Sequence, residues 1–201
     1  MKRIITLALA LAAALAAMAG GQADIAGQIL KKNGSRSYTC TFKQAKYLKM
    51  MKKEVKSEGT LYTCKGNMAM RYTEPEGDYL VINDKQFVMQ TRGRKLNHNI
   101  QKGSPLLTLR NTLLYCMHGD LNAIATENGG ELAYVKEGDL HVFSVSTAAK
   151  GPRGYRKVTL KYNAAFDLRE MTLEEVNGNY TVYTLAPLKE WIPDTDQFTV
   201  K

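Results

Sequence analysis

Side chains able to act as acids, bases or nucleophiles are few in this 201-residue sequence, and none falls into a catalytic pattern. The three histidines are His98, His118 and His141, and no two are four residues apart, so the H-E-x-x-H zinc motif is absent. Glu174 and Glu175 lie in a predicted strand, where adjacent side chains point to opposite faces and cannot act together across one bond. No G-x-S-x-G elbow or phosphate-binding loop occurs. We therefore predict that the protein has no catalytic residues and is not an enzyme.

The cysteines also lack a functional spacing. Cys40, Cys64 and Cys116 form neither a C-x-x-C motif nor a set of metal ligands with the histidines, so we predict no metal and no cofactor. An odd number of cysteines in an exported chain leaves at least one thiol unpaired. If Leu61 faces inward, strict alternation puts Cys64 outward and Cys40 inward on a neighbouring strand. A Cys40–Cys64 disulfide would then be geometrically unfavourable.

Large, flexible apolar side chains are better represented than reactive ones. Methionines stand at positions 68, 70, 89 and 117, and leucines crowd residues 106–114. Methionine suits a site that must accept chains of varying shape, because its side chain is unbranched and polarizable. The same composition also fits an ordinary dry core, so the residues by themselves leave both readings open.

The N-terminus is typical of an export signal. Met1-Lys2-Arg3 precedes an apolar run from Ile4 to about Ala17, too short to span a bilayer. Small residues follow, with predicted cleavage near residue 19 or 23. We therefore expect residues 1–23 to be a signal peptide and residues 24–201 to form one exported domain; a short N-terminal anchor is the alternative.

Positive charge is a second feature of the chain. Removing Lys2 and Arg3 with the signal would lower the formal net charge from +9 to +7. An exported protein has little use for nucleic-acid binding, so we predict none. The charge indicates contact with anionic head groups or an acidic partner, unless it serves only solubility. It is densest in the predicted connection from Lys46 to Lys56.

The elements that must position these side chains are mostly strands. Tyr38, Cys40 and Phe42 begin a period of two that predicts a half-buried strand. Ser104-Pro105 predicts the start of a helix ending at Gly119, with a short second helix to Glu127. Asp24 to about Lys32 predicts a further short helix. Other strands are predicted at 60–64, 68–72, 79–82, 87–89, 131–136, 140–146, 155–163, 166–176, 179–185 and 197–200. The class is therefore α+β, with a strongly curved antiparallel sheet interrupted once by helices.

A series of short motifs runs along the chain: Phe42-Lys43-Gln44, Gly59-Thr60-Leu61-Tyr62, Met68–Pro75, Tyr79–Val88 and Ile192–Phe198. In this order they resemble the LolA-like periplasmic lipoprotein-carrier family. The first resembles its F-x-Q signature and the second its G-x-L-aromatic strand. The leucine-rich helical insertion also falls at the family's position. Each motif is weak alone, but their order is more specific.

The resemblance implies an unclosed β-barrel with a helical lid over a concave apolar face. It implies an acyl-binding cavity, for which the candidate residues are Phe42, Leu61, Met68, Met70, Tyr72, Met89, Leu106, Leu109, Leu113 and Met117. The family holds its lid with an arginine followed by proline, and Lys65-Gly66 stands at that position. Lys65 is therefore the lid-latch candidate, and as a point donor it would make a weaker latch.

The implied function is a soluble, monomeric periplasmic carrier. It would receive acylated lipoproteins from an inner-membrane ABC transporter and pass them to an outer-membrane acceptor. Two alternatives remain: a LolA-like carrier of another lipid, such as a glycolipid or pigment precursor, and a periplasmic domain that senses lipids or lipoproteins.

Overall fold

A computed structural model describes residues 21–83, 85–99, 105–147 and 155–199. The predicted signal lies almost wholly in residues 1–20, outside the described residues. A helix covers residues 21–33, starting before the predicted Asp24. None of the helices in the described part of the chain is long and apolar enough to cross a membrane.

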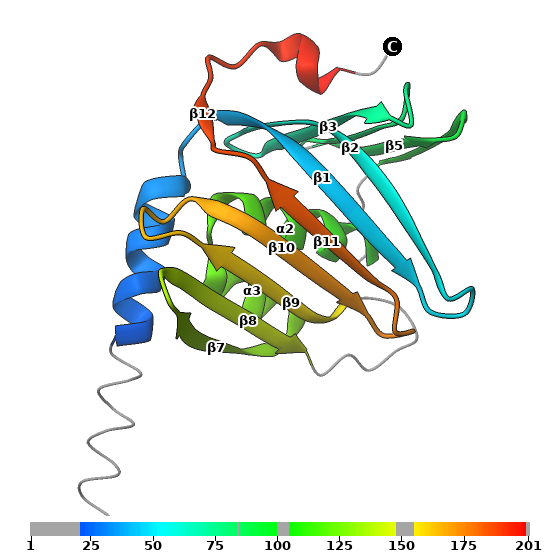
Figure 1. Cartoon of the computed structure of the whole chain (residues 1–201). Coiled ribbons are helices and arrows are strands. Elements are labelled where there is room, and N and C mark those ends of the chain that lie inside the picture. Colours follow the sequence, from blue (N-terminus) through cyan, green and yellow to red (C-terminus); the bar gives the residue numbers. More distant parts are fainter. Residues whose placement is uncertain (1–20, 84, 100–104, 148–154, 200–201) are drawn as a thin grey trace, which may run out of the picture.

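Twelve antiparallel strands form one strongly curved sheet (Figure 1). Their spatial order is β6-β5-β4-β3-β2-β1-β11-β10-β9-β8-β7, with β12 also paired to β1. The first six strands are β1 (Tyr38–Leu48), β2 (Lys53–Cys64), β3 (Asn67–Glu74), β4 (Tyr79–Ile82), β5 (Gln86–Thr91) and β6 (Arg94–Asn99). The others are β7 (Gly130–Glu137), β8 (Leu140–Thr147), β9 (Tyr155–Tyr162), β10 (Leu168–Glu175), β11 (Tyr180–Leu185) and β12 (Lys189–Glu190).

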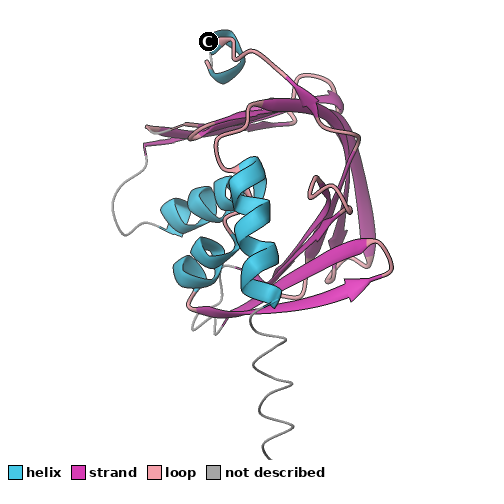
Figure 2. Ribbon diagram, turned by 90° about the vertical axis from the view of Figure 1, so that its left-hand side faces the viewer, coloured by secondary structure: helices cyan, strands magenta, loops and turns pink. Residues whose placement is uncertain are grey.

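The sheet is not closed, because its edge strands β6 and β7 do not pair with each other. Helices α2 (Pro105–His118) and α3 (Leu121–Asn128) come between these two edges in the chain. Figure 2 shows the sheet bending around the helices, which occupy its concave side. The predicted class, an unclosed antiparallel barrel with a helical part over the concave face, is thus confirmed.

Two predicted elements were wrong. Residues 46–56 are not a basic connection: β1 and β2 stay in register as far as Leu48 and Lys53, so only residues 49–52 form the loop. Lysine has a low strand propensity, but cross-strand pairing overrides it here. In place of the strand predicted at 197–200, residues 197 and 198 belong to the 3-10 helix η1 (Thr195–Phe198), and residue 200 lies outside the described residues. Its start is capped by Asp194, and the Arg71 guanidinium donates to the Gln197 and Thr199 carbonyls.

One half of the concave side is filled by core. Tyr38, Met68 and Ile82 are buried there with Ile29 of the N-terminal helix and Ile124 of α3. The Tyr38 hydroxyl donates to the Met117 carbonyl at 2.8 Å, which satisfies one of the carbonyls left free in the last turn of α2. This end of α2 is therefore fixed to the sheet.

His118 ends α2 in the same core and is almost fully buried. Neither ring nitrogen makes a hydrogen bond of good geometry within the described structure. Burial lowers the pKa of His118, and the nearby backbone of Asn33 and Cys64 offsets part of this shift. Burial lowers the pKa of His141 as well.

Folding stability should therefore fall as the solution is acidified from pH 7 to pH 5. The pKa of histidine in the unfolded chain is about 6.5. Below that pH the unfolded chain binds a proton that the folded His118 does not. The contribution of neutral, buried His118 to folding stability is therefore fully present above this pKa and declines below it. The loss grows with the difference between the pKa of His118 in the unfolded and the folded chain. Urea unfolding at several pH values measures it. His118→Gln should flatten the slope relative to the parent, and an unchanged slope would contradict the assignment.

Candidate functional site

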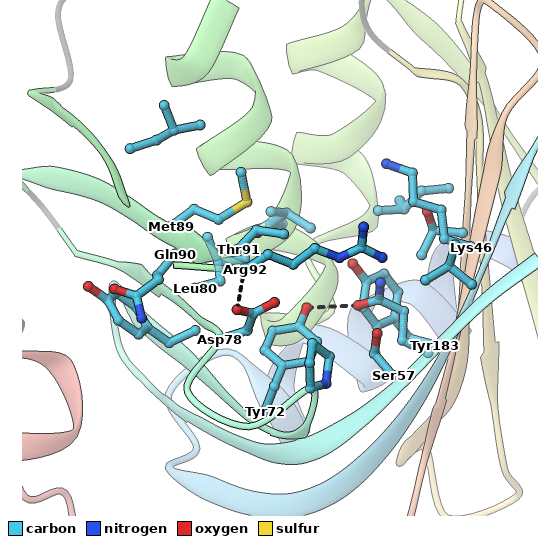
Figure 3. A pocket seen from close by; sticks show the side chains of 18 of the residues that line it. Lys46, Ser57, Tyr72, Asp78, Leu80, Met89, Gln90, Thr91, Arg92 and Tyr183 are labelled. Atoms are coloured by element: carbon cyan, nitrogen blue, oxygen red, sulfur yellow. Dashed lines mark hydrogen bonds between the residues drawn. The ribbon is translucent and has the colours of Figure 1, made fainter. Parts of the chain in front are cut away.

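The other half of the concave side holds a cavity of about 860 Å³. It lies between the ends of β1 to β5, the strands β10 and β11, and the first turns of α2. Phe42 and Tyr72, in edge-to-face contact with ring centroids 5.2 Å apart, lie between core and cavity. The Tyr72 hydroxyl donates to Gln44 Oε1 at 2.7 Å, so the final residue of the F-x-Q motif fixes this tyrosine (Figure 3).

The cavity has a largely apolar wall. One row of paired residues crosses the sheet from Met70 to Leu80, Met89 and Leu96. Exposure rises along this row, from 3% at Met70 and 7% at Leu80 to 48% at Leu96, so the wall passes from core to open space. The apolar lining consists of Leu48, Val55, Leu80, Phe87, Met89, Leu96, Leu106, Leu109, Leu113 and Leu173.

The candidate acyl-binding residues separate into two groups. Five line the cavity: Tyr72, Met89, Leu106, Leu109 and Leu113. The other five are buried in the adjoining core: Phe42, Leu61, Met68, Met70 and Met117. The division follows the direction of α2, whose first turns cover the cavity and whose last turn is fixed in the core by Tyr38.

A polar mouth was missed by the sequence reasoning. Its charged side chains are Lys46, Lys56, Glu74, Asp78, Arg92 and Glu175. The two lysines form ion pairs: Lys46 Nζ lies 3.6 Å from Glu175 Oε1, and Lys56 Nζ lies 3.4 Å from Glu54 Oε1. The Arg92 guanidinium, in contrast, has no carboxylate within 4 Å in the described part of the chain. Arg92 thus brings a cation without an ion-pair partner to the cavity.

Arg92 occupies a turn that arginine rarely adopts. Its φ is +51° and that of Gly93 is +73°, so both residues are left-handed in the β5–β6 turn. Asn and Gly adopt this conformation more easily. The turn is held by the Arg92 backbone N–H, which donates to Asp78 Oδ1 at 2.6 Å. Figure 3 shows the Arg92 side chain extending into the cavity, toward the wall that carries Tyr183. In the sequence, the Arg92-Gly93 pair between two strand-like runs is the signal that could have indicated this turn.

The tyrosines of the site are neutral donors. Burial raises the pKa of Tyr183 to about 12 and that of Tyr72 further, and it raises the pKa of Tyr155 well above its ordinary value. Their hydroxyls therefore stay protonated at neutral pH. No group of three or more His, Cys, Asp or Glu side chains that could hold a metal occurs among the described residues. The thiols of Cys40, Cys64 and Cys116 are free and buried; Cys40 and Cys116 belong to the core cluster, whereas Cys64 does not.

One contact between the first half of α2 and the sheet comes from the helix itself. Arg110 Nε donates to the Asn83 carbonyl, in the β4–β5 turn, at 3.0 Å, and a second nitrogen donates to Asn111 Oδ1. Lys65, the latch candidate, lies exposed in the β2–β3 turn. No hydrogen bond or ion pair joins its side chain to a helix within the described residues.

Replacing Arg110 with alanine should loosen the cavity half of α2. One charge-assisted hydrogen bond contributes on the order of 1 kcal/mol, so amide hydrogen exchange in the first half of α2 should quicken about 5-fold. Exchange near Met117 should not change, because Tyr38 holds that end. Lys65→Ala is the matched comparison, and equal effects of the two variants would contradict this assignment.

These observations define a class: a half-open barrel with an amphipathic cavity under a helix. No protein-family model matches the chain, and no curated protein matches it either. Solved structures of similar architecture include a LolA superfamily protein from Nitrosomonas europaea. The two sequences are 12% identical, the alignment covers 87% of this chain and 97% of that chain, and the TM-score is 0.43.

Two further structures are similar to this chain. One is a DUF1329 family protein from Desulfovibrio piger, with 11% identity, 88% and 95% of the two chains covered, and a TM-score of 0.48. The other is a putative outer membrane lipoprotein-sorting protein domain from Vibrio parahaemolyticus, with 11% identity, 86% and 94% covered, and a TM-score of 0.41.

Proposed function

We propose that this protein is a periplasmic carrier that holds the acyl chains of a lipid or lipoprotein in its cavity. The observation that carries the proposal is the cavity of about 860 Å³ with ten apolar side chains on its wall. Sites for small ligands usually enclose about 300–1,000 Å³ and are lined mainly by apolar side chains. The size and the lining therefore suit an apolar chain.

Carriage of an acyl chain needs shelter from water and no covalent chemistry. Each exposed methylene costs about 0.8 kcal/mol, which the leucines and Met89 of the wall would remove. The cargo would move from the inner to the outer membrane, with an inner-membrane ABC transporter as donor and an outer-membrane protein as acceptor. Release by an outward movement of the first half of α2 would break the Arg110 hydrogen bond to the β4–β5 turn.

The charged side chains of the polar mouth indicate what kind of head group the cargo carries. An acyl chain against the leucines would place its head group near Arg92, whose guanidinium has no ion-pair partner in the described structure. Arginine binds carboxylate and phosphate oxygens through paired, charge-assisted hydrogen bonds. We therefore propose an anionic amphiphile as the preferred ligand.

Displacement of a fluorescent fatty-acid probe from delipidated protein tests both parts. A fatty acid should displace the probe about 10-fold more strongly than the alcohol of equal chain length. Arg92→Ala should remove this preference, while Arg94→Ala, a nearby exposed arginine outside the cavity lining, should keep it. Failure of the parent protein to bind the probe would refute the carrier; equal displacement by acid and alcohol would refute only the anionic head group.

Native mass spectrometry of the exported protein identifies the cargo. A co-purifying acylated molecule is expected. A purely polar ligand would contradict the proposal, and a glycolipid or pigment precursor would replace the lipoprotein as cargo.

A further inference from the structure

The tip of the β1–β2 hairpin carries the most exposed apolar side chains near the cavity. Met50 is 98% exposed and Met51 is 66% exposed, in the loop between Leu48 and Lys53. Neither methionine contributes to the core, and neither lines the cavity. Isolated apolar residues are common on surfaces, but two adjacent ones at a protruding tip have no structural use here.

The hairpin projects beyond the rest of the sheet. Residues 53–57 of β2 pair with β1 alone, because the pairing of β2 with β3 begins only at Glu58. Figure 1 shows this tip at the end of the sheet away from the N-terminal helix. Lys46, Leu48, Val55 and Lys56, lower on the same hairpin, line the cavity. The tip and the cavity mouth are thus parts of one element.

Positive charge surrounds the two methionines. Residues 46–56 contain five lysines and one glutamate, and Lys49, Lys52 and Lys53 are exposed. An aromatic pair lies at the base of the tip, where Tyr47 stacks on Tyr180 with centroids 5.1 Å apart. Lysines, tyrosines and flexible apolar side chains together are the composition of segments that lie at a membrane interface.

We infer that this hairpin tip docks onto the surface of an anionic lipid bilayer, with Met50 and Met51 entering the head-group region. Phospholipid head groups attract the lysines, and the apolar boundary beneath them accepts the methionines. The lysines alone would suit any acidic surface; the two adjacent exposed methionines at a projecting tip add the apolar component with which interfacial segments enter a bilayer, and this favours the bilayer. Docking would bring the cavity mouth to the membrane from which cargo is taken or to which it is given.

Co-flotation with phosphatidylcholine vesicles, with and without phosphatidylglycerol, tests the inference. The full mature protein should bind the anionic vesicles and release them at high salt. Lys49→Gln/Lys53→Gln should weaken binding about 30-fold, since each lysine near an anionic surface contributes about 5-fold. Lys65→Gln/Lys189→Gln removes equal charge elsewhere and should have little effect.

A second variant isolates the apolar part. Met50→Ser/Met51→Ser keeps every charge and should weaken vesicle binding about 10-fold or more. Ile192→Ser removes a side chain that is 88% exposed but distant in the chain, and should leave binding unchanged. Full binding by the methionine variant would overturn the entry of Met50 and Met51 into the head-group region. Absence of vesicle binding by the parent would overturn bilayer docking and favour an acidic protein partner.

Docking of the hairpin tip on a bilayer does not depend on which cargo the cavity holds. The four substituted hairpin residues do not line the cavity, so their variants should bind the fatty-acid probe like the parent. Lost vesicle binding with retained probe binding separates the two proposals.

Discussion

Met89→Glu is expected to weaken acyl-probe binding about 100-fold while the protein remains folded, whereas Met70→Glu is expected to unfold it. The two methionines lie in the same row of the sheet, on either side of Leu80. Met89 lines the cavity, where a carboxylate can stay hydrated when the site is empty but opposes an acyl chain. Met70 is only 3% exposed within the core. An unpaired charge buried there costs at least about 3 kcal/mol, whereas the total free energy of unfolding of a domain is typically about 5–15 kcal/mol.

Probe titration and thermal melting on each variant measure the difference. Met89→Leu and Met70→Leu are the controls, because each keeps the apolar volume and should bind and melt nearly as the parent does. Undiminished binding by Met89→Glu would remove this residue from the site. Equal unfolding of the two glutamate variants would mean that the wall at Met89 is closed core and not cavity.

Gly59→Ala is expected to destabilise the protein by about 3 kcal/mol or more, although it adds a single methyl group. A Cβ at this position would lie 2.1 Å from the Arg71 carbonyl oxygen and 2.7 Å from Tyr72 Cα. Both atoms are backbone of the adjacent strand, so the β2–β3 pair would have to separate locally. The register of this pair shifts between Glu58 and Gly59, which marks the bend where β3 approaches β2.

Gly27→Ala is the matched comparison. This glycine lies in the N-terminal helix, and a Cβ there would meet nothing within 4 Å. Alanine should be neutral or should stabilise by about 0.5–1 kcal/mol, because glycine is a poor helix former. Urea unfolding compares the two variants. A Gly59→Ala protein as stable as Gly27→Ala would show that the strands can move apart without cost.

Local patterns predicted most elements correctly because they depend on neighbouring residues. The period of two in Tyr38, Cys40 and Phe42 identified β1, and Ser104-Pro105 identified the start of α2. The long basic hairpin was missed, since its strands have low intrinsic propensity and exist through pairing. The helix η1 was missed because its stability depends on Arg71, which is 126 residues from Gln197 in the chain.

The sequence by itself determined the antiparallel strands and their helical insertion, since periodicity and capping are encoded locally; the apolar concave face was implied by the family resemblance. The sequence could not separate Met70 from Met89, because both are methionines of inward-facing strand positions, or Met117 from Leu109, because both are apolar residues of one helix. Only the tertiary structure decided which of them is core and which is cavity. That choice depends on where the last turn of α2 and the N-terminal helix pack, and it is fixed by long-range contacts such as the Tyr38 hydroxyl on the Met117 carbonyl, 79 residues away.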